Sequence, residues 1–223
     1  MRHGRLRRWA PVLVLLVVAA VAWWASMPDP GPPVVVPAVD VATARDRLAE
    51  LPVHEALPST GYRREEFGNG WAERDGCSTR EQVLARDLTG LARAGCRVLT
   101  GTLEDPYGGS RIAFTSDRPS QVQIDHVVAL ADAWRTGAQD WSPAERTAFA
   151  NDLVNLLAVA GDLNQDKGAS DASAWLPPAR SLRCPYVIRQ IAVKARWGLW
   201  VTPAERAALD RELGRCRTVV VDP

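Results

Sequence analysis

Residues 124–168 place the strongest constraint on the fold, because a few polar side chains stand at fixed points beside two apolar runs. In chain order these polar residues are Asp125, His126, Asn155, Asn164 and Lys167. Residues 155–159 read Asn-Leu-Leu-Ala-Val, which is short enough for a strand, and Gly161 marks a turn after them. We expect an extended segment there, followed by a short helix over residues 162–168.

The residue types in this stretch suit the hydrolysis of a phosphodiester, which requires an activated water, a group that holds the phosphate and a cation near the leaving oxygen. His126 is one of three histidines in the chain, and a neutral imidazole near pH 7 can take a proton from water. Lys167 follows Asn164 by three residues and would share its helix face. Lys167 is either a phosphate contact or a surface charge. Asn155 and Asn164, each taken alone, are also consistent with a capping role.

The order Asp-His, Asn, Asn resembles the HNH (ββα-metal) endonuclease superfamily. It resembles more closely the C-terminal nuclease domain of GmrSD-type restriction endonucleases, in its small exported form. Three motifs carry the resemblance over most of residues 60–215: Asp125 to Leu130 (Asp-His-Val-Val-Ala-Leu), the turn that begins Asp105-Pro-Tyr, and the helix start Gly76-Cys-Ser-Thr-Arg. The resemblance implies an α+β fold, with a small ββα-metal nuclease core embedded in additional helices.

The resemblance also implies roles for individual residues. His126 would be the general base, and Asn155 would frame it from the paired strand. Asp125 and Asn164 would hold one divalent cation through hard oxygen donors, which favours Mg²⁺, with Mn²⁺ as the second choice. The implied function is a metal-dependent endonuclease that acts on DNA or, as the other possibility, on RNA.

The N-terminal residues predict export. Four arginines (Arg2, Arg5, Arg7 and Arg8) precede an apolar run from Trp9 to Ala25. This pattern is typical of membrane targeting with the basic end in the cytoplasm. Residues 1–27 are therefore either a single-pass anchor or a cleaved signal peptide. Residues 28–39 form a proline-rich linker to a nuclease domain over residues 40–223, which would be membrane-anchored outside the cytoplasm or secreted.

The four cysteines fit an exported protein, where an even number favours disulfides. Of the three possible pairings we favour Cys77–Cys96 and Cys184–Cys216, because each encloses one predicted helix-containing segment. No closely spaced set of four cysteine or histidine ligands is present, so we do not expect a zinc site.

Positive charge is concentrated locally. The chain has a net charge of +1, but the first eight residues hold four arginines and the rest therefore carries −3. Residues 178–217 contain nine lysines and arginines, which are either solvated with intramolecular ion pairs or part of a phosphate-binding surface. Arg189 and Arg196 lie seven residues apart on one helix face, and we predict phosphate contacts from them and from Lys167. A G-x-x-x-x-G-K-[ST] motif is absent from the sequence, so no nucleotide cofactor is expected.

Local signals predict the surrounding elements. Asp40 can cap a helix to about Leu51. Further helices should begin at three capping boxes: Ser78/Glu81, Ser142/Glu145 and Thr202/Glu205. We expect the first of these three helices to end near Gly90 or Gly95. Residues 96–102 and 110–115 are typical of strands joined by a turn at residues 105–109.

Two other functions compete with the nuclease. A catalytically silent extracellular module on the same fold would bind a protein or polysaccharide without cleaving nucleic acid. A cell-wall hydrolase is the weaker alternative, because such enzymes use paired carboxylates or zinc, and no acid pair stands out in the sequence.

Overall fold

The computed structural model describes residues 39–217 and 220–221, which belong to one unit over residues 36–223. The predicted export segment at residues 1–27 and nearly all of the linker lie outside the described residues. Among the helices that are described, none has the length and apolar character needed to span a membrane.

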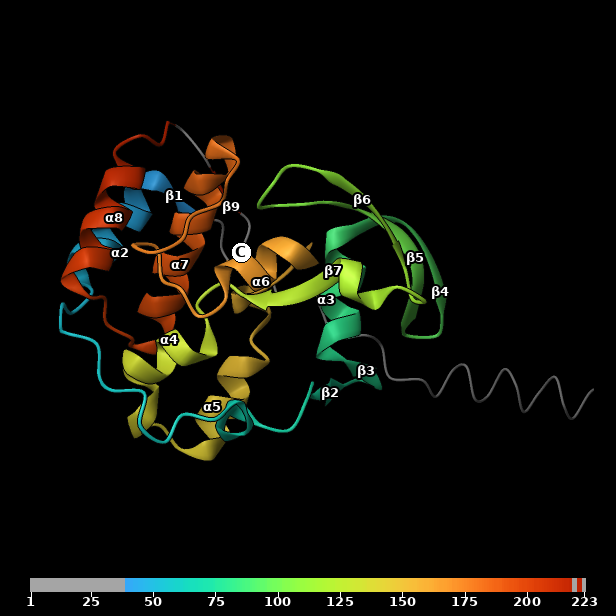
Figure 1. Ribbon diagram of the computed structural model, residues 1–223, viewed down its shortest axis with the longest axis horizontal. Helices are drawn as coiled ribbons and strands as arrows, with labels where there is room; N and C mark the ends of the chain where they lie inside the picture. The colour runs from blue at the N-terminus through green and yellow to red at the C-terminus, as the bar shows by residue number, and fades with distance from the viewer. Residues whose placement is uncertain (1–38, 218–219, 222–223) are drawn as a thin grey trace, which may run out of the picture. The chain divides into compact units, whose positions relative to one another are not determined.

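The described chain mixes helices with small sheets, as the predicted α+β class requires (Figure 1). The strands are β1 (Val39–Asp40), β2 (Glu73–Arg74), β3 (Cys77–Ser78), β4 (Leu88–Ala94), β5 (Arg97–Glu104), β6 (Arg111–Thr115), β7 (Val122–His126), β8 (Leu156–Ala160) and β9 (Val220–Val221). The α-helices are α2 (Val41–Glu50), α3 (Thr79–Asp87), α4 (Leu130–Arg135), α5 (Pro143–Ala150), α6 (Gly161–Lys167), α7 (Arg183–Trp197) and α8 (Pro203–Leu213). Short 3₁₀ turns are η2 (Arg64–Phe67), η3 (Pro119–Gln121), η4 (Ala138–Asp140), η5 (Leu153–Asn155) and η6 (Arg180–Leu182).

The capping residues begin the helices that they predict. Helix α5 carries a complete capping box between Ser142 and Glu145, and α8 carries one between Thr202 and Glu205. Asp40 accepts a hydrogen bond of 2.7 Å from the Thr43 amide and so caps α2. Each cap satisfies backbone donors that the first helical turn leaves open. These helix starts are confirmed.

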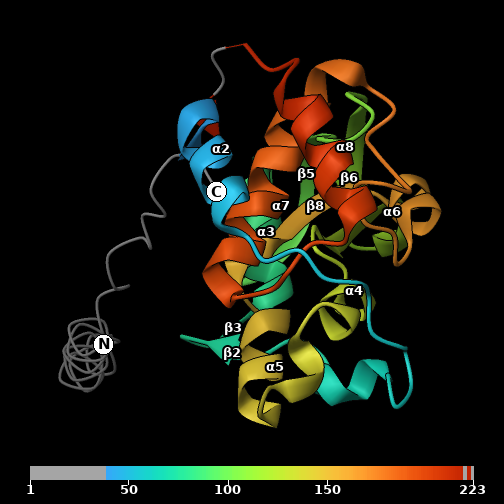
Figure 2. The ribbon, with the colours of Figure 1, turned by 90° about the vertical axis from the view of Figure 1, so that its left-hand side faces the viewer.

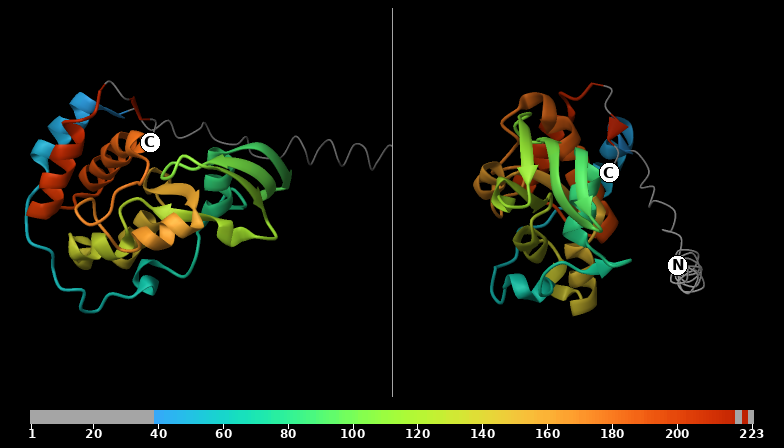
Figure 3. Two further views of the ribbon diagram at one scale, coloured as in Figure 1. Left: turned by 45° about the horizontal axis from the view of Figure 1, so that its top comes forward. Right: turned by 90° about the vertical axis from the view of Figure 1, so that its right-hand side faces the viewer.

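The end of α3 differs from the prediction. The helix ends at Asp87, before Gly90 and Gly95, and residues 88–94 form strand β4. This strand pairs antiparallel with β5, which pairs in turn with β6, so β4 is an edge strand. Most of its side chains are exposed. It therefore lacks the apolar alternation that identifies a strand in sequence, and its hydrogen bonds to β5 define it instead. The right-hand view of Figure 3 shows the three green strands of this sheet.

Strands β7 and β8 and helix α6 form the centre of the fold. The strands pair antiparallel, with Asp125 opposite Leu157 and His126 opposite Leu156. Helix α6 follows β8 without a loop and begins at Gly161. A Cβ atom at Gly161 would lie 2.0 Å from the backbone oxygen of Ser120 in η3, so only glycine permits the close approach of α6 to the turn that leads into β7.

Helix α7 is the core of the helical part. Its residues Val187, Ile188 and Ile191 are fully buried, and α2 and α8 pack against it, as Figure 2 shows. The predicted disulfide pairing is confirmed: Cys184, on α7, is bonded to Cys216 beyond α8, and Cys77 of β3 is bonded to Cys96 between β4 and β5. Each bond restricts the unfolded chain and so favours the folded state.

Candidate functional site

A polar pocket opens at the end of β7. It has a volume of about 450 Å³, and Asp125, His126 and Asn164 all line it. Strand β7 supplies the first two residues, and α6 supplies the third from the element that follows β8. The structure therefore brings together the predicted base and both predicted metal ligands.

His126 is held in one orientation. Its Nε2 atom lies 2.9 Å from the backbone oxygen of Ala150, and the Trp71 ring stacks on it at 5.8 Å between centroids. Because a carbonyl oxygen only accepts, Nε2 carries the ring hydrogen and Nδ1 keeps its lone pair. Burial lowers the pKa of His126 to about 3, and the charges of Arg64 and Lys167 act in the same direction. The imidazole is therefore neutral at physiological pH, which is the protonation state of a general base.

Asp125 is fixed through both carboxylate oxygens. Lys167 donates to Oδ1 at 3.0 Å, and the Tyr107 hydroxyl donates to Oδ2 at 2.5 Å. Burial raises the pKa of Asp125, while Lys167 and Tyr107 oppose that shift. A carboxylate has about four lone-pair sites, so each oxygen can still bind a further partner.

Asn155 lies beside the backbone that follows His126 and does not line the pocket. Its side chain accepts a hydrogen bond of 2.8 Å from the Val128 amide and donates one of 3.1 Å to the Val128 oxygen. Its own carbonyl oxygen accepts from the Val127 amide. The fully buried Asn155 therefore fixes the chain directly after His126.

Asn164 completes an oxygen-rich set of donors. Its Nδ2 atom donates to Gln123 Oε1 at 2.8 Å, and Gln123 lines the same pocket. This hydrogen bond uses the Nδ2 atom and leaves the Oδ1 atom of Asn164 available in the pocket that Asp125 also lines. Amide and carboxylate oxygens are hard donors, and these residues therefore fit Mg²⁺ better than a soft metal.

The three predicted phosphate contacts have other partners in the structure. Lys167 is 1% exposed and donates to Asp125 and to the His126 oxygen. Arg189 is also buried, and it donates to the Val154 oxygen at 2.9 Å. Arg196 pairs with Asp152 at 3.0 Å and lines a different pocket. The structure does not place these three cations together around Asp125 and His126.

Ion pairing also accounts for much of the basic charge between residues 178 and 217. Several of these cations form ion pairs with described residues, namely Lys194, Arg196, Arg206, Arg211 and Arg215. Of the two interpretations of this region, intramolecular pairing is the one that these contacts support.

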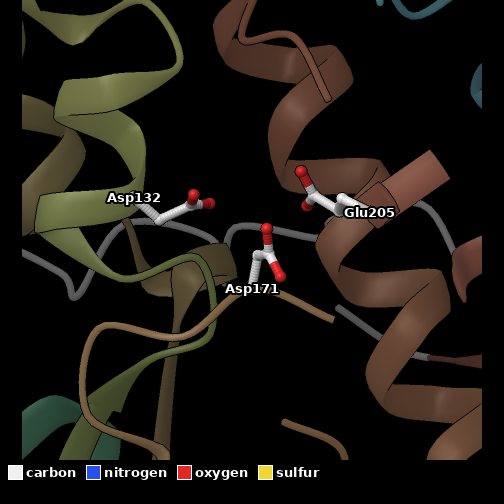
Figure 4. A group of neighbouring side chains, drawn as sticks. All are labelled: Asp132, Asp171 and Glu205. Carbon is white, nitrogen blue, oxygen red and sulfur yellow. The ribbon is translucent and has the colours of Figure 1, made fainter. Parts of the chain in front are cut away.

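A second acidic group, which includes side chains of α4 and α8, lies elsewhere in the molecule (Figure 4). Asp132 of α4, Glu205 of α8 and Asp171 each offer an oxygen, and these oxygens lie within 4.8 Å of one another, so the group could hold a metal ion. The ammonium of Lys194 already lies 3.0 Å from Asp132 and 2.7 Å from Glu205.

Two of the three carboxylates in this acidic group are buried, whereas Asp171 is partly exposed. Asp132 and Glu205 are 3% and 0% exposed, and neither lines the pocket of His126. The Oε1 atom of Glu205 is buried without a hydrogen-bond partner among the described residues. Burial raises the pKa of Glu205 to about 7, and the charge of Lys194 opposes that shift. Burial alone would lower the pKa of Lys194, but the negative charges of Asp132 and Glu205 outweigh it and raise that pKa.

Tyr107, Trp71 and Arg64 also belong to this site, and the sequence motif does not predict them. Tyr107 belongs to the Asp105-Pro-Tyr turn, and Asp105 anchors that turn by accepting from the Gly108 and Ala160 amides. The Asp105-Pro-Tyr motif was therefore the sequence feature from which a role for Tyr107 could have been predicted. Trp71 and Arg64 come from a turn-rich segment without periodicity, and only the folded chain brings them to His126.

Comparison with known proteins defines the family. Residues 79–211 match the family described as GmrSD restriction endonucleases, C-terminal domain, and the chain belongs to this family. An uncharacterized secreted protein of Arthroderma benhamiae is 40% identical over 207 residues, which cover 91% of this chain and 98% of that protein. No solved structure matches the chain.

Proposed function

We propose that the protein is a metal-dependent endonuclease that hydrolyses phosphodiester bonds of DNA outside the cytoplasmic membrane. One observation carries the proposal: the base, the carboxylate and the amide expected from the family motif line the same pocket. Membership of a restriction-endonuclease family supports a nucleic-acid substrate. Cleavage of RNA in place of DNA is the alternative substrate preference within the same mechanism.

His126 acts as the general base in this proposal. Its Nδ1 atom accepts a proton from the attacking water, while the hydrogen bond from Nε2 to Ala150 holds the ring and its tautomer. Asn155 is a positioning residue, because it holds the backbone of residues 127 and 128 next to the base. A base of this kind contributes roughly 10²–10⁴-fold to the rate.

Asp125 and Asn164 would hold one divalent cation, with Mg²⁺ the first choice and Mn²⁺ the second. The bound cation would supply positive charge that stabilises the leaving oxygen of the phosphodiester. Lys167 and Tyr107 keep the Asp125 carboxylate in place at the pocket that it lines.

An extracytoplasmic location has two supports. The relative from Arthroderma benhamiae is described as secreted, and the chain forms two disulfides, which persist in oxidising compartments. The predicted segment at residues 1–27 would provide export, either as an anchor or as a signal peptide.

Incubation of the full-length oxidised protein with plasmid DNA and with RNA, in Mg²⁺, Mn²⁺ or EDTA, tests the proposal. We expect metal-dependent nicking that His126→Ala abolishes without unfolding the protein. A folded wild-type protein that leaves both substrates intact in every metal would instead favour the silent binding module. Release of sugar from cell-wall material would favour the hydrolase.

A further inference from the structure

The segment from Tyr62 to Trp71 forms one wall of the site, although it precedes the part of the chain that matches the family. Tyr62 and Arg64 line the pocket of Asp125 and Asn164. A smaller pocket of about 60 Å³ lies on the Trp71 side of His126. Arg64 and His126 line both pockets, so Arg64 borders the space on both sides of the base.

Arg64 has no competing partner in the part of the chain that the structure describes. Its side chain is exposed and forms no ion pair or hydrogen bond with any described residue. The adjacent Arg63 differs, because it pairs with Glu66 at 2.7 Å.

The backbone around Arg64 is fixed before any substrate binds. Arg64 begins the 3₁₀ turn η2, which ends at Phe67, and the Phe67 ring is buried against Phe149 and Trp134. Arg146 donates to the Glu66 oxygen at 3.1 Å and ties the same turn to α5. A cation on an anchored turn loses less conformational freedom when it binds an anion than one on a free loop.

We propose that Arg64 binds a backbone phosphate of the nucleic-acid strand at the pocket of His126. This inference rests on the proposed nuclease function and adds the group that holds the substrate. A guanidinium matches a phosphate with two parallel hydrogen bonds, and such contacts are stronger than those between neutral groups. The three cations predicted from the sequence have protein partners in the structure, whereas Arg64 is exposed at the pocket.

The test compares the full-length protein with Arg64→Ala, Arg64→Lys and two control variants. Arg97→Ala removes an exposed charge from β5, and Arg63→Ala removes the neighbouring charge that is paired with Glu66. Binding of a fluorescein-labelled DNA duplex is measured in EDTA at several salt concentrations, and cleavage is measured in Mg²⁺. Both readouts are needed, because binding does not depend on the catalytic step.

We expect Arg64→Ala to weaken binding and to lower kcat/KM by about 10- to 100-fold, the range of a lost hydrogen bond to a charged group. It should also reduce the slope of log affinity against log salt by about 1, because one phosphate contact is lost. Arg64→Lys should restore part of the affinity, since it returns the charge without the bidentate geometry. Both control variants should stay close to wild type.

Each result bears on one of the two proposals. If wild type cleaves DNA and Arg64→Ala matches Arg97→Ala in binding, cleavage and salt slope, the Arg64 inference is overturned and the nuclease stands. If wild type binds DNA through Arg64 and does not cleave it, the nuclease is overturned and the phosphate contact stands. A wild-type protein that neither binds nor cleaves overturns both.

Discussion

Two buried lysine–carboxylate groups lie in this molecule, and they differ in access. Lys167 pairs with Asp125 at 3.0 Å, and Lys194 pairs with Asp132 at 3.0 Å and Glu205 at 2.7 Å. Both lysines are buried, but only Asp125 borders a pocket of about 450 Å³ that also reaches His126. We infer that the open group serves chemistry and that the closed group joins α4, α7 and α8.

The largest effect that we expect is a difference in cleavage rate between variants of the two lysine–carboxylate groups. Asp125→Asn keeps the shape of the side chain but removes the charge that attracts a cation. It should therefore lower the cleavage rate by about a thousandfold, since a bound metal supplies several kcal/mol of transition-state stabilisation. Asp132→Asn should leave the rate per folded molecule unchanged. Single-turnover cleavage of labelled DNA measures both, and equal losses in the two variants would contradict the distinction.

The second effect is a difference in the free energy of unfolding between variants of the two lysines. Lys194→Met leaves buried carboxylates without their counter-ion and should lower the free energy of unfolding by about 3–5 kcal/mol. Lys167→Met should cost less, about 1–2 kcal/mol, because water in the pocket can reach Asp125. Urea unfolding followed by circular dichroism compares the two variants. A larger loss from Lys167→Met would mean that the pocket does not solvate Asp125.

The pH dependence of stability gives a smaller effect. The pKa of Glu205 is raised from 4.5 to about 7 in the folded protein, so the folded state binds more protons than the unfolded state between these values. Stability from this group is therefore full below pH 4.5 and is lost as the pH rises through about 7. Asp132, Asp171 and Lys194 are the charged groups that face Glu205.

Glu205→Gln removes this titration and keeps a side chain that can cap α8. We expect Tm of wild type to fall by a few °C more than Tm of Glu205→Gln between about pH 5 and pH 8. Differential scanning fluorimetry at several pH values checks the difference. Parallel curves for the two proteins would show that Glu205 keeps an ordinary pKa.

The smallest expected effect concerns Arg196, which lies away from both groups and pairs with Asp152 while 54% exposed. An exposed pair of this kind contributes little, so Arg196→Ala should change the free energy of unfolding by less than about 0.5 kcal/mol. DNA affinity should change far less than for Arg64→Ala. A loss of DNA affinity equal to that of Arg64→Ala would instead support the phosphate-binding surface on α7 that we predicted from the sequence.

Local signals in the sequence were enough to predict much of the fold. The starts of α5 and α8 follow from side chains three residues apart, and the pairing of β5 with β6 follows from one turn. Strand β4 could not be predicted in this way, because it lies at an exposed edge and depends on β5 for its hydrogen bonds. Its sequence carries no buried face to reveal it.

Some features of the candidate site could likewise be predicted from the sequence, whereas others depend on tertiary contacts. The presence of Asp125, His126 and Asn164 in one pocket could be predicted, because their order in the chain resembles the family motif. The burial of Lys167 could not, since it depends on how closely α6 approaches the turn before β7 at Gly161. Arg64 reaches the pocket through the packing of Phe67 against α5, a contact between residues that are far apart in sequence.

Mn²⁺ binding measured by electron paramagnetic resonance tests whether the cation lies between Asp125 and Asn164. The folded wild-type protein should bind one Mn²⁺ ion, and Asn164→Ala and Asp125→Asn should each lose that binding, while Asp132→Asn keeps it. Unchanged binding in Asn164→Ala and Asp125→Asn, together with a loss in Asp132→Asn, would place the cation in the closed group and contradict the proposed site.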